Sequence, residues 1–222
     1  RGHGFETGVH RALMGYGLFP LSQLEIEILY GDVPIKAHLD FTLVADQPQP
    51  TVRILEVKST VRLPATLSGS HAMQIGGQTV LLKAYWDQPI FNLIQETGEV
   101  LYHKIFSEMC NKCLGVPLSD ASACDIQGWV LCLSMCDAKA FGPFFPKDTD
   151  NSRCLDMAFE FWETMIALKD NLLNLNTIQT VQGLSPVCPS CLWRKDCPHF
   201  KGSSLPEWED TLAQFMNLKT QK

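Results

Sequence analysis

Long apolar runs are absent from this 222-residue sequence, and so are internal repeats and low-complexity tracts. A membrane-spanning helix needs about 18 or more consecutive apolar residues, so we expect no span. The first residues, Arg1 to Glu6, lack the charged and apolar regions of a secretory signal, which favours a cytoplasmic protein. Because the chain begins with Arg rather than Met, one interpretation is that the natural protein starts earlier.

An excess of positive charge is also lacking. The 18 Lys and Arg against 24 Asp and Glu leave a net charge of −6. This balance argues against a protein that coats nucleic acid by bulk attraction, because phosphate contacts require Lys and Arg. It does not exclude a nuclease, since the acidic excess can lie on other faces while one groove is basic.

Periodicity in the first part of the chain predicts a helix, three strands and a second helix. Residues 5–16 and residues 69–86 carry apolar side chains at helical spacing. Between them, apolar and polar residues alternate in three segments, 23–30, 35–44 and 51–58, as in half-buried strands. The short turns that separate the three segments predict an antiparallel meander.

The remainder of the chain predicts further strands, one long helix and a cysteine-rich end. The expected elements are a hairpin (90–94 and 100–106), a strand (126–135), a helix (151–175), a cysteine-rich loop (186–200) and a final helix from about Pro206. We expect a core domain at 1–180, with 87–125 as a candidate insertion, and a second domain at 181–222. The predicted fold class is α/β, a mixed sheet flanked by helices.

A pair of carboxylates and a lysine stand on neighbouring predicted strands. Asp40 lies on one strand, and Glu56-Val57-Lys58 ends the next. Glu56 and Lys58 share a face because side chains alternate along a strand. Two close carboxylates repel unless a cation such as Mg²⁺ or Mn²⁺ lies between them, and that ion can activate water and polarise a phosphoryl oxygen. Lys58 would then orient the attacking water or stabilise transition-state charge, and the Val57 carbonyl is a further oxygen ligand.

Taken alone, this pattern is more typical of solvated strand residues, with Glu56 and Lys58 forming an ordinary surface ion pair. Its neighbours favour the functional interpretation. His10 lies on the first predicted helix, and a neutral imidazole suits a metal such as Mn²⁺. Gln74 and Gln78 lie one turn apart on the helix that follows Lys58.

The order His10, Asp40, Glu56-x-Lys58 and a glutamine-bearing helix resembles the RecB-like branch of the PD-(D/E)XK nucleases. That resemblance implies a restriction-endonuclease-like sheet and a metal-dependent DNA exonuclease. It implies catalytic Asp40, Glu56 and Lys58, a metal site of His10, Asp40, Glu56 and Val57, and DNA binding by Gln74 and Gln78. Gln78 stands where the family's Gln-x-x-x-Tyr motif has tyrosine.

Nine cysteines are many for this length, and three of them form a C-x2-C-x5-C motif near the C-terminus: Cys188, Cys191 and Cys197. Thiolates at this spacing suit zinc or an iron–sulfur cluster. The motif resembles the cluster-binding tail of CRISPR-associated adaptation exonucleases (the fourth numbered Cas family), AddB-type helicase–nucleases and exonuclease V. The resemblance implies a 4Fe–4S rather than a 2Fe–2S cluster.

In those families the fourth cluster cysteine precedes the histidine-bearing helix, and this sequence has no cysteine before His10. Either that residue precedes Arg1 or another group replaces it. The candidate substitutes are Cys110, Cys113, Cys124, Cys154 and His199. A zinc site that joins Cys110 and Cys113 to Cys188 and Cys191 is a weaker alternative, because it leaves Cys197 without a role.

The expected partner is DNA, with a CRISPR adaptation complex or a helicase and recombination machinery as the implied context. Two other hypotheses stay open. The chain is a zinc-binding interaction module without catalysis, or it is an inactive nuclease fold with a structural role. The presence of Asp40, Glu56 and Lys58 together argues against the inactive fold.

Overall fold

The computed structural model describes residues 2–95, 97–148 and 151–169 of the chain. The chain divides into two units after Glu160, and the architecture below is that of the first unit. The domain boundary expected near residue 180 and the cysteine-rich loop at 186–200 both lie outside the described residues.

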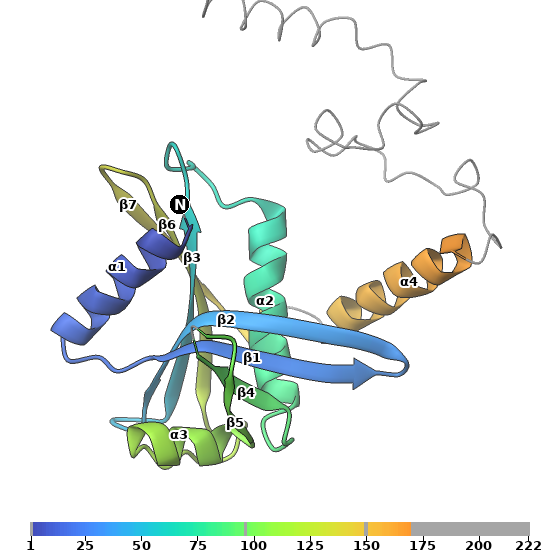
Figure 1. The fold of residues 1–222 in the computed structure, drawn as a ribbon, viewed down its shortest axis with the longest axis horizontal. Coiled ribbons are helices and arrows are strands. Elements are labelled where there is room, and N and C mark those ends of the chain that lie inside the picture. Colours follow the sequence, from blue (N-terminus) through green and yellow to red (C-terminus); the bar gives the residue numbers. More distant parts are fainter. Residues whose placement is uncertain (1, 96, 149–150, 170–222) are drawn as a thin grey trace, which may run out of the picture. The chain divides into compact units, whose positions relative to one another are not determined.

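Seven strands form one mixed sheet in the order β5-β4-β1-β2-β3-β6-β7 (Figure 1). The elements in chain order are α1 (Gly2–Gly15), β1 (Leu21–Tyr30), β2 (Val33–Ala45), β3 (Thr51–Ser59), α2 (Gly69–Ala84), β4 (Phe91–Ile94), β5 (Val100–Lys104), α3 (Phe106–Leu114), β6 (Asp125–Leu133), β7 (Ala138–Phe144), a 3₁₀ turn η1 (Pro146–Asp148) and α4 (Asn151–Lys169). Strands β3 and β6 are parallel, and every other neighbouring pair is antiparallel. The mixed α/β sheet flanked by helices is therefore confirmed.

The meander of β1, β2 and β3 is confirmed as an antiparallel run. Tyr30 pairs with Val33 across a tight turn in which Gly31 has a φ of +61°, a conformation that favours glycine. The first turns of α4 contact this hairpin. The Tyr30 hydroxyl donates to Asp156 Oδ1 at 3.2 Å, and the Phe159 ring lies against Gly31.

Two helices cover opposite sides of β3 in Figure 1. Helix α2 begins after Ser68, whose hydroxyl accepts the His71 backbone N–H, and buries Ile75 and Val80. Helix α1 lies against β3 from the other side. The predicted helices at 5–16 and 69–86 are thus confirmed, with α1 beginning earlier and α2 ending two residues sooner than expected.

The segment 87–125, expected as a candidate insertion, extends the sheet and completes its core. Strand β4 pairs with β1, and β5 pairs with β4, as the predicted hairpin required. The predicted strand at 100–106 is too long, because Phe106 begins α3, a helix that the sequence analysis missed. Phe106 packs between Trp86 and Phe91, with ring centroids 4.7 and 5.5 Å away. All three rings are buried, so this segment is part of the main hydrophobic core.

Strand β7, at the edge of the sheet beyond β6, was also missed from the sequence. The predicted strand at 126–135 corresponds to β6, and β6 pairs in parallel with β3 along its whole length. Among the helices that the structure describes, none combines the length and the apolar character needed to cross a membrane.

Candidate functional site

Strands β2 and β3 separate at the carboxylate pair. Their ladder ends at Phe41 opposite Leu55, one step before Asp40 would face Glu56. Asp40 Oδ2 instead accepts the backbone N–H of Val57 at 2.8 Å. From Asp40 back toward its start, β2 pairs with β1 but no longer with β3. The pocket that residues of β2, β3 and α2 line lies where the two strands have separated.

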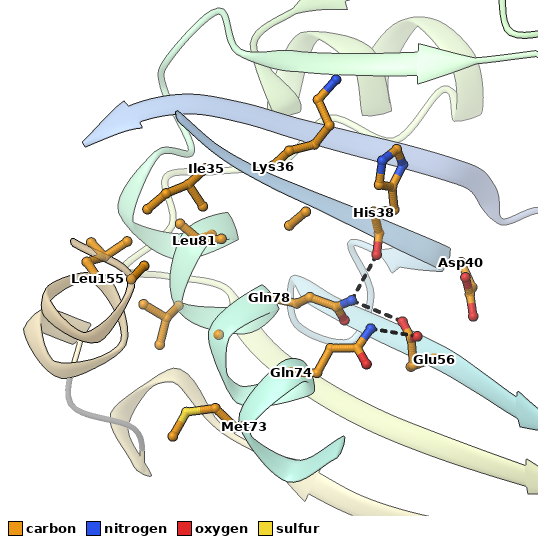
Figure 2. A pocket seen from close by; sticks show the side chains of 14 residues that line it. Ile35, Lys36, His38, Asp40, Glu56, Met73, Gln74, Gln78, Leu81 and Leu155 are labelled. Atoms are coloured by element: carbon orange, nitrogen blue, oxygen red, sulfur yellow. Dashed lines mark hydrogen bonds between the residues drawn. The ribbon is translucent and has the colours of Figure 1, made fainter. Parts of the chain in front are cut away.

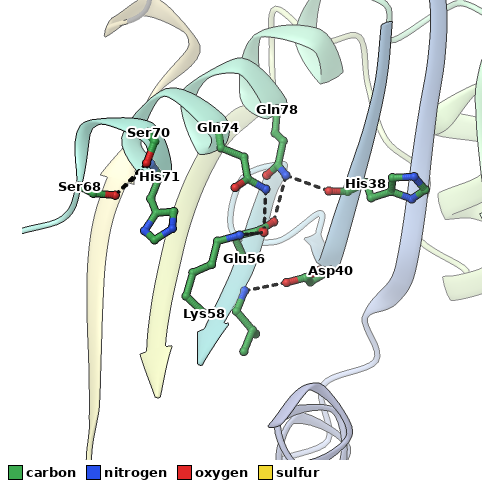
Figure 3. A network of polar contacts seen from close by, with 10 residues as sticks. His38, Asp40, Glu56, Lys58, Ser68, Ser70, His71, Gln74 and Gln78 are labelled. Atoms are coloured by element: carbon green, nitrogen blue, oxygen red, sulfur yellow. Dashed lines mark hydrogen bonds and ion pairs between the residues drawn. The ribbon is translucent and has the colours of Figure 1, made fainter. Parts of the chain in front are cut away.

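Glu56 is buried, with 4% of its surface exposed, and three side chains donate to it (Figure 3). Its Oε1 accepts from Lys58 Nζ at 2.7 Å and from Gln74 Nε2 at 2.8 Å, and its Oε2 accepts from Gln78 Nε2 at 3.0 Å. Gln74 and Gln78 are four residues apart in α2, so both side chains project from one face of the helix. Helix α2 therefore sets the orientation of the Glu56 carboxylate.

Gln78 also bridges the two separated strands. Its Nε2 donates to the His38 carbonyl on β2 at 2.8 Å as well as to Glu56 on β3. The Gln78 side chain thus connects β2 and β3 beyond the point where the backbone hydrogen bonds between these strands end. This contact, which the sequence alone could not locate, links β2 to β3 across the gap.

The pKa of Asp40 is raised to about 6. Burial is the largest cause, followed by the charge of Glu56, and the charge of Glu6 on α1 adds to the effect. The Val57 N–H and the Lys58 ammonium act in the opposite direction. A carboxylate with this pKa is held near a second carboxylate without a full counter-charge, which is the situation that a bound cation relieves.

The contact that the structure shows for His10 is with Phe41, the neighbour of Asp40 in β2. Its ring stacks on Phe41, with ring centroids 6.0 Å apart and an interplanar angle of 13°. Phe41 is adjacent to Asp40 in β2, and neighbouring side chains on a strand point to opposite faces. Among the described residues, no group of three or more His, Cys, Asp or Glu is arranged to hold a metal ion. The structure therefore does not join His10 to Asp40 and Glu56, and a metal role for His10 stays a prediction.

The chemistry of the remaining donors nevertheless fits a hard divalent cation. Asp40, Glu56 and the Val57 carbonyl supply only oxygen, the atom that Mg²⁺ and Mn²⁺ prefer. Magnesium is commonly held by one or two carboxylates, with water and substrate phosphates as its other ligands. A site of this open kind does not require a third protein carboxylate or a histidine.

A pocket of 470 Å³ runs from the carboxylate pair along α2 (Figure 2). Asp40 and Glu56 lie at one end, Leu155 lies at the other, and Gln78 lies between them. Ile35, Leu81 and Leu155 lie toward the end that is remote from the carboxylates (Figure 2). Met73, Val80 and Ala158 also line the pocket. The pocket thus joins a charged compartment to an apolar one.

A second polar cluster lies beside this pocket, and the sequence analysis did not identify it. Glu25 on β1 has only 5% of its surface exposed and contacts Lys36 Nζ at 3.2 Å, His38 Nε2 at 3.2 Å and Asn92 Nδ2 at 3.3 Å. Lys36 and His38 also line the pocket. The available signal was alternation along β2, which places Lys36, His38 and Asp40 on one side of the strand.

The cysteine motif cannot be placed, because Cys188, Cys191 and Cys197 lie outside the described residues, as does His199. Cys110 is buried in α3, and its pKa is raised first by burial and then by the nearby Cys113 and Cys124. A protonated, buried thiol behaves as a small core side chain.

Comparison with known proteins identifies no family for this chain. No family model matches the sequence, and no curated protein matches it. One similar solved structure is described as "Crystal structure of SSO0001". It has a TM-score of 0.48 and 15% identity over 89% of this chain and 69% of that chain. A likeness this distant shows neither family nor activity.

Proposed function

We propose that this chain is a divalent-metal-dependent deoxyribonuclease of the RecB-like PD-(D/E)XK type. The observation that carries the proposal is the meeting of Asp40, Glu56 and Lys58 where β2 and β3 separate, at the end of a pocket that Asp40 and Glu56 line. The reaction is hydrolysis of phosphodiester bonds in single-stranded DNA or at DNA ends, as an exonuclease.

Asp40, Glu56 and the Val57 carbonyl would hold Mg²⁺ or Mn²⁺. When bound, such an ion polarises a phosphoryl oxygen and lowers the pKa of water. The raised pKa of Asp40 supports this assignment, because a cation favours the ionised carboxylate. Activity should therefore rise with pH as Asp40 loses its proton.

Lys58 and the two glutamines have separate roles. The Lys58 ammonium lies 2.7 Å from Glu56 Oε1, where it can orient water and stabilise negative charge on phosphate. Gln74 and Gln78 both donate to Glu56, so we assign them first to positioning this carboxylate. Their predicted contact with DNA stays a prediction.

The test is degradation of end-labelled single- and double-stranded DNA with Mg²⁺ or Mn²⁺. We expect Glu56→Ala and Lys58→Ala each to lower the rate by about 100-fold or more. Lys104→Ala, at an exposed position on β5, is the matched control and should keep full activity. Undiminished cleavage by both site variants would refute the assignment, and the labelled products would show end polarity.

The iron–sulfur cluster and the biological context belong to the same proposal. They rest on Cys188, Cys191 and Cys197 and on the resemblance to adaptation and recombination nucleases. Within this proposal the cluster has a structural role and the substrate is DNA that is processed in CRISPR adaptation or in repair.

A further inference from the structure

Gln23, near the start of β1, has a backbone conformation that an extended strand does not have. Its φ is +55°, and among the residues that the structure describes it is the only one besides glycines with a positive φ. An L side chain crowds the neighbouring carbonyl oxygen in this left-handed region, so glutamine keeps the conformation only where its surroundings hold it there. Backbone strain of this kind is found especially at functional sites.

The left-handed residue coincides with a one-step interruption of the ladder between β1 and β2. The pairs on either side of this step are formed: Ser22 with Phe41 and Leu24 with Leu39. One residue on each strand lies between these pairs, Gln23 on β1 and Asp40 on β2, and these two residues do not pair. The register is the same before and after the step, so the distortion is confined to Gln23 and Asp40.

Asp40 has no ladder partner on its other side either. The β2–β3 ladder ends at Phe41, and every other residue of β2 pairs with β1 or with β3. The contact that joins Asp40 to β3 is made by its side chain, whose Oδ2 accepts the Val57 N–H at 2.8 Å (Figure 3). In an uninterrupted antiparallel ladder, a backbone carbonyl of β2 would accept this N–H.

A side-chain bond of this kind requires an open ladder. In a regular strand, backbone bonds to both neighbours fix the peptide planes, and the side chains stand roughly perpendicular to the sheet. A carboxylate held in that way points out of the sheet and not toward a backbone N–H of the next strand. Asp40 can turn toward β3 because the ladder is open on both of its sides. The buried side chains of Leu24, Leu39 and Phe41 keep the two strands together around the opening.

We infer that Gln23 is a positioning residue for the proposed metal site: its left-handed backbone opens the β1–β2 ladder opposite Asp40, and the opening lets the Asp40 carboxylate turn toward Glu56 and Val57. The inference rests on the proposed nuclease function for the role of the site, but not for its geometry. The backbone of Gln23, and not its amide, has the effect. Glycine, which adopts positive φ readily, should therefore replace Gln23, whereas a β-branched residue should not.

The first experiment follows the bond between Asp40 and Val57 without metal, by amide hydrogen exchange of the full chain in chelator. Gln23→Gly should leave the Val57 amide as protected as in the wild type. Gln23→Val favours extended backbone, so this amide should exchange at least about tenfold faster relative to the Leu55 amide. Leu29→Val, at an exposed and paired position of the same strand, is the matched control and should change neither amide.

A melting temperature measured for each variant shows which proteins are folded. Gln23→Thr, which is also β-branched, replaces the valine variant if that protein does not fold. Unchanged exchange of the Val57 amide in a folded β-branched variant overturns the inference. Loss of protection in Gln23→Gly also overturns it, because the amide side chain and not the backbone would then be responsible.

The second experiment titrates Mn²⁺ calorimetrically into the same proteins. The wild type and Gln23→Gly should bind the ion equally, and the β-branched variant should bind it about tenfold or more weakly, as when a partner of a metal ligand is lost. Equal affinity in a folded β-branched variant overturns the inference. If no protein of the series binds Mn²⁺, the proposed metal site fails, and the exchange of the Val57 amide still decides whether Gln23 positions Asp40.

Discussion

Asp40 is a carboxylate whose negative charge the surrounding fold opposes. Its residue type and its place on a strand before Glu56-x-Lys58 could be read from the sequence. Its pKa could not, because burial and the charges of Glu56 and Glu6 depend on which elements pack together. The same limit applies to Gln78, whose two acceptors lie 40 and 22 residues away along the chain.

Replacing Asp40 with asparagine should stabilise the metal-free protein at alkaline pH. The folded-state pKa of about 6 exceeds the ordinary value of 3.8, so the folded protein binds the proton more tightly than the unfolded chain. The wild type therefore loses stability as pH rises from about 4 through 6, and the Asp40→Asn variant would avoid this loss. After allowance for solvent screening, the gain above pH 7 should be on the order of 1 kcal/mol.

The measurement is urea unfolding in chelator at pH 8, 6 and 4.5. The difference between Asp40→Asn and the wild type should shrink as the pH falls. Asp87→Asn, at an exposed position, serves as the control with no expected change. A difference that stays constant across this pH range would show that the Asp40 charge is not opposed by the fold.

Helix α2 is the element that organises the site. The helical pattern of α2 and its two glutamines could be recognised in the sequence. The distance between α2 and the sheet could not be predicted from it. That distance depends on Gly128 of β6, which faces Ile75 and Thr79. A Cβ at this position would lie 2.6 Å from Ile75 Cγ1 and 2.9 Å from Thr79 Cγ2.

Gly128→Ala should therefore destabilise the protein by about 1–3 kcal/mol, because the added methyl group pushes α2 away from β6. Displacing α2 also moves Gln74 and Gln78, so nuclease activity should fall further than the loss of folded protein explains. Chemical denaturation and the DNA assay measure the two effects.

Gly77→Ala is the matched control within α2. Outside the adjoining residues and the backbone of α2 itself, no heavy atom lies within 4 Å of the Cβ position. Alanine is also the better helix former, so we expect a gain of about 0.5–1 kcal/mol. Equal stability of the two alanine variants would show that Gly128 does not set the position of the helix.

The two elements that were missed have identifiable physical reasons. Strand β7 contains Gly142-Pro143, a pair of residues that normally indicates a turn. Proline is tolerated in this strand because β7 lies at the edge of the sheet and pairs only with β6. Helix α3 is short, and its apolar residues Phe106, Met109 and Cys110 continue directly from a strand. Local periodicity over nine residues does not separate these two states reliably.

At the scale of the whole molecule, the C-terminal cysteines supply a prediction that is independent of the nuclease site. Anaerobically purified protein should be brown, with visible absorbance from an iron–sulfur centre. Cys191→Ser should bleach the colour and lower the melting temperature, because cluster ligation contributes free energy of folding.

Visible absorption spectra and metal analysis measure this directly, and Cys136→Ser, at an exposed position, is the matched control that should stay brown. Colourless protein with stoichiometric zinc would contradict the cluster and leave the nuclease proposal standing. Loss of stability without loss of colour in Cys191→Ser would show that this cysteine is not a ligand.

The sequence by itself determined the β1–β3 meander, the helical segments on either side of it, and the chain order of Asp40, Glu56 and Lys58. These features follow from alternation, helical spacing and short turns, which act between neighbours in the chain. Only the tertiary structure decided that β6 pairs in parallel with β3, that β2 and β3 separate at Asp40, and that Gln78 spans their gap. These features depend on contacts between distant segments and on burial, which local patterns do not encode.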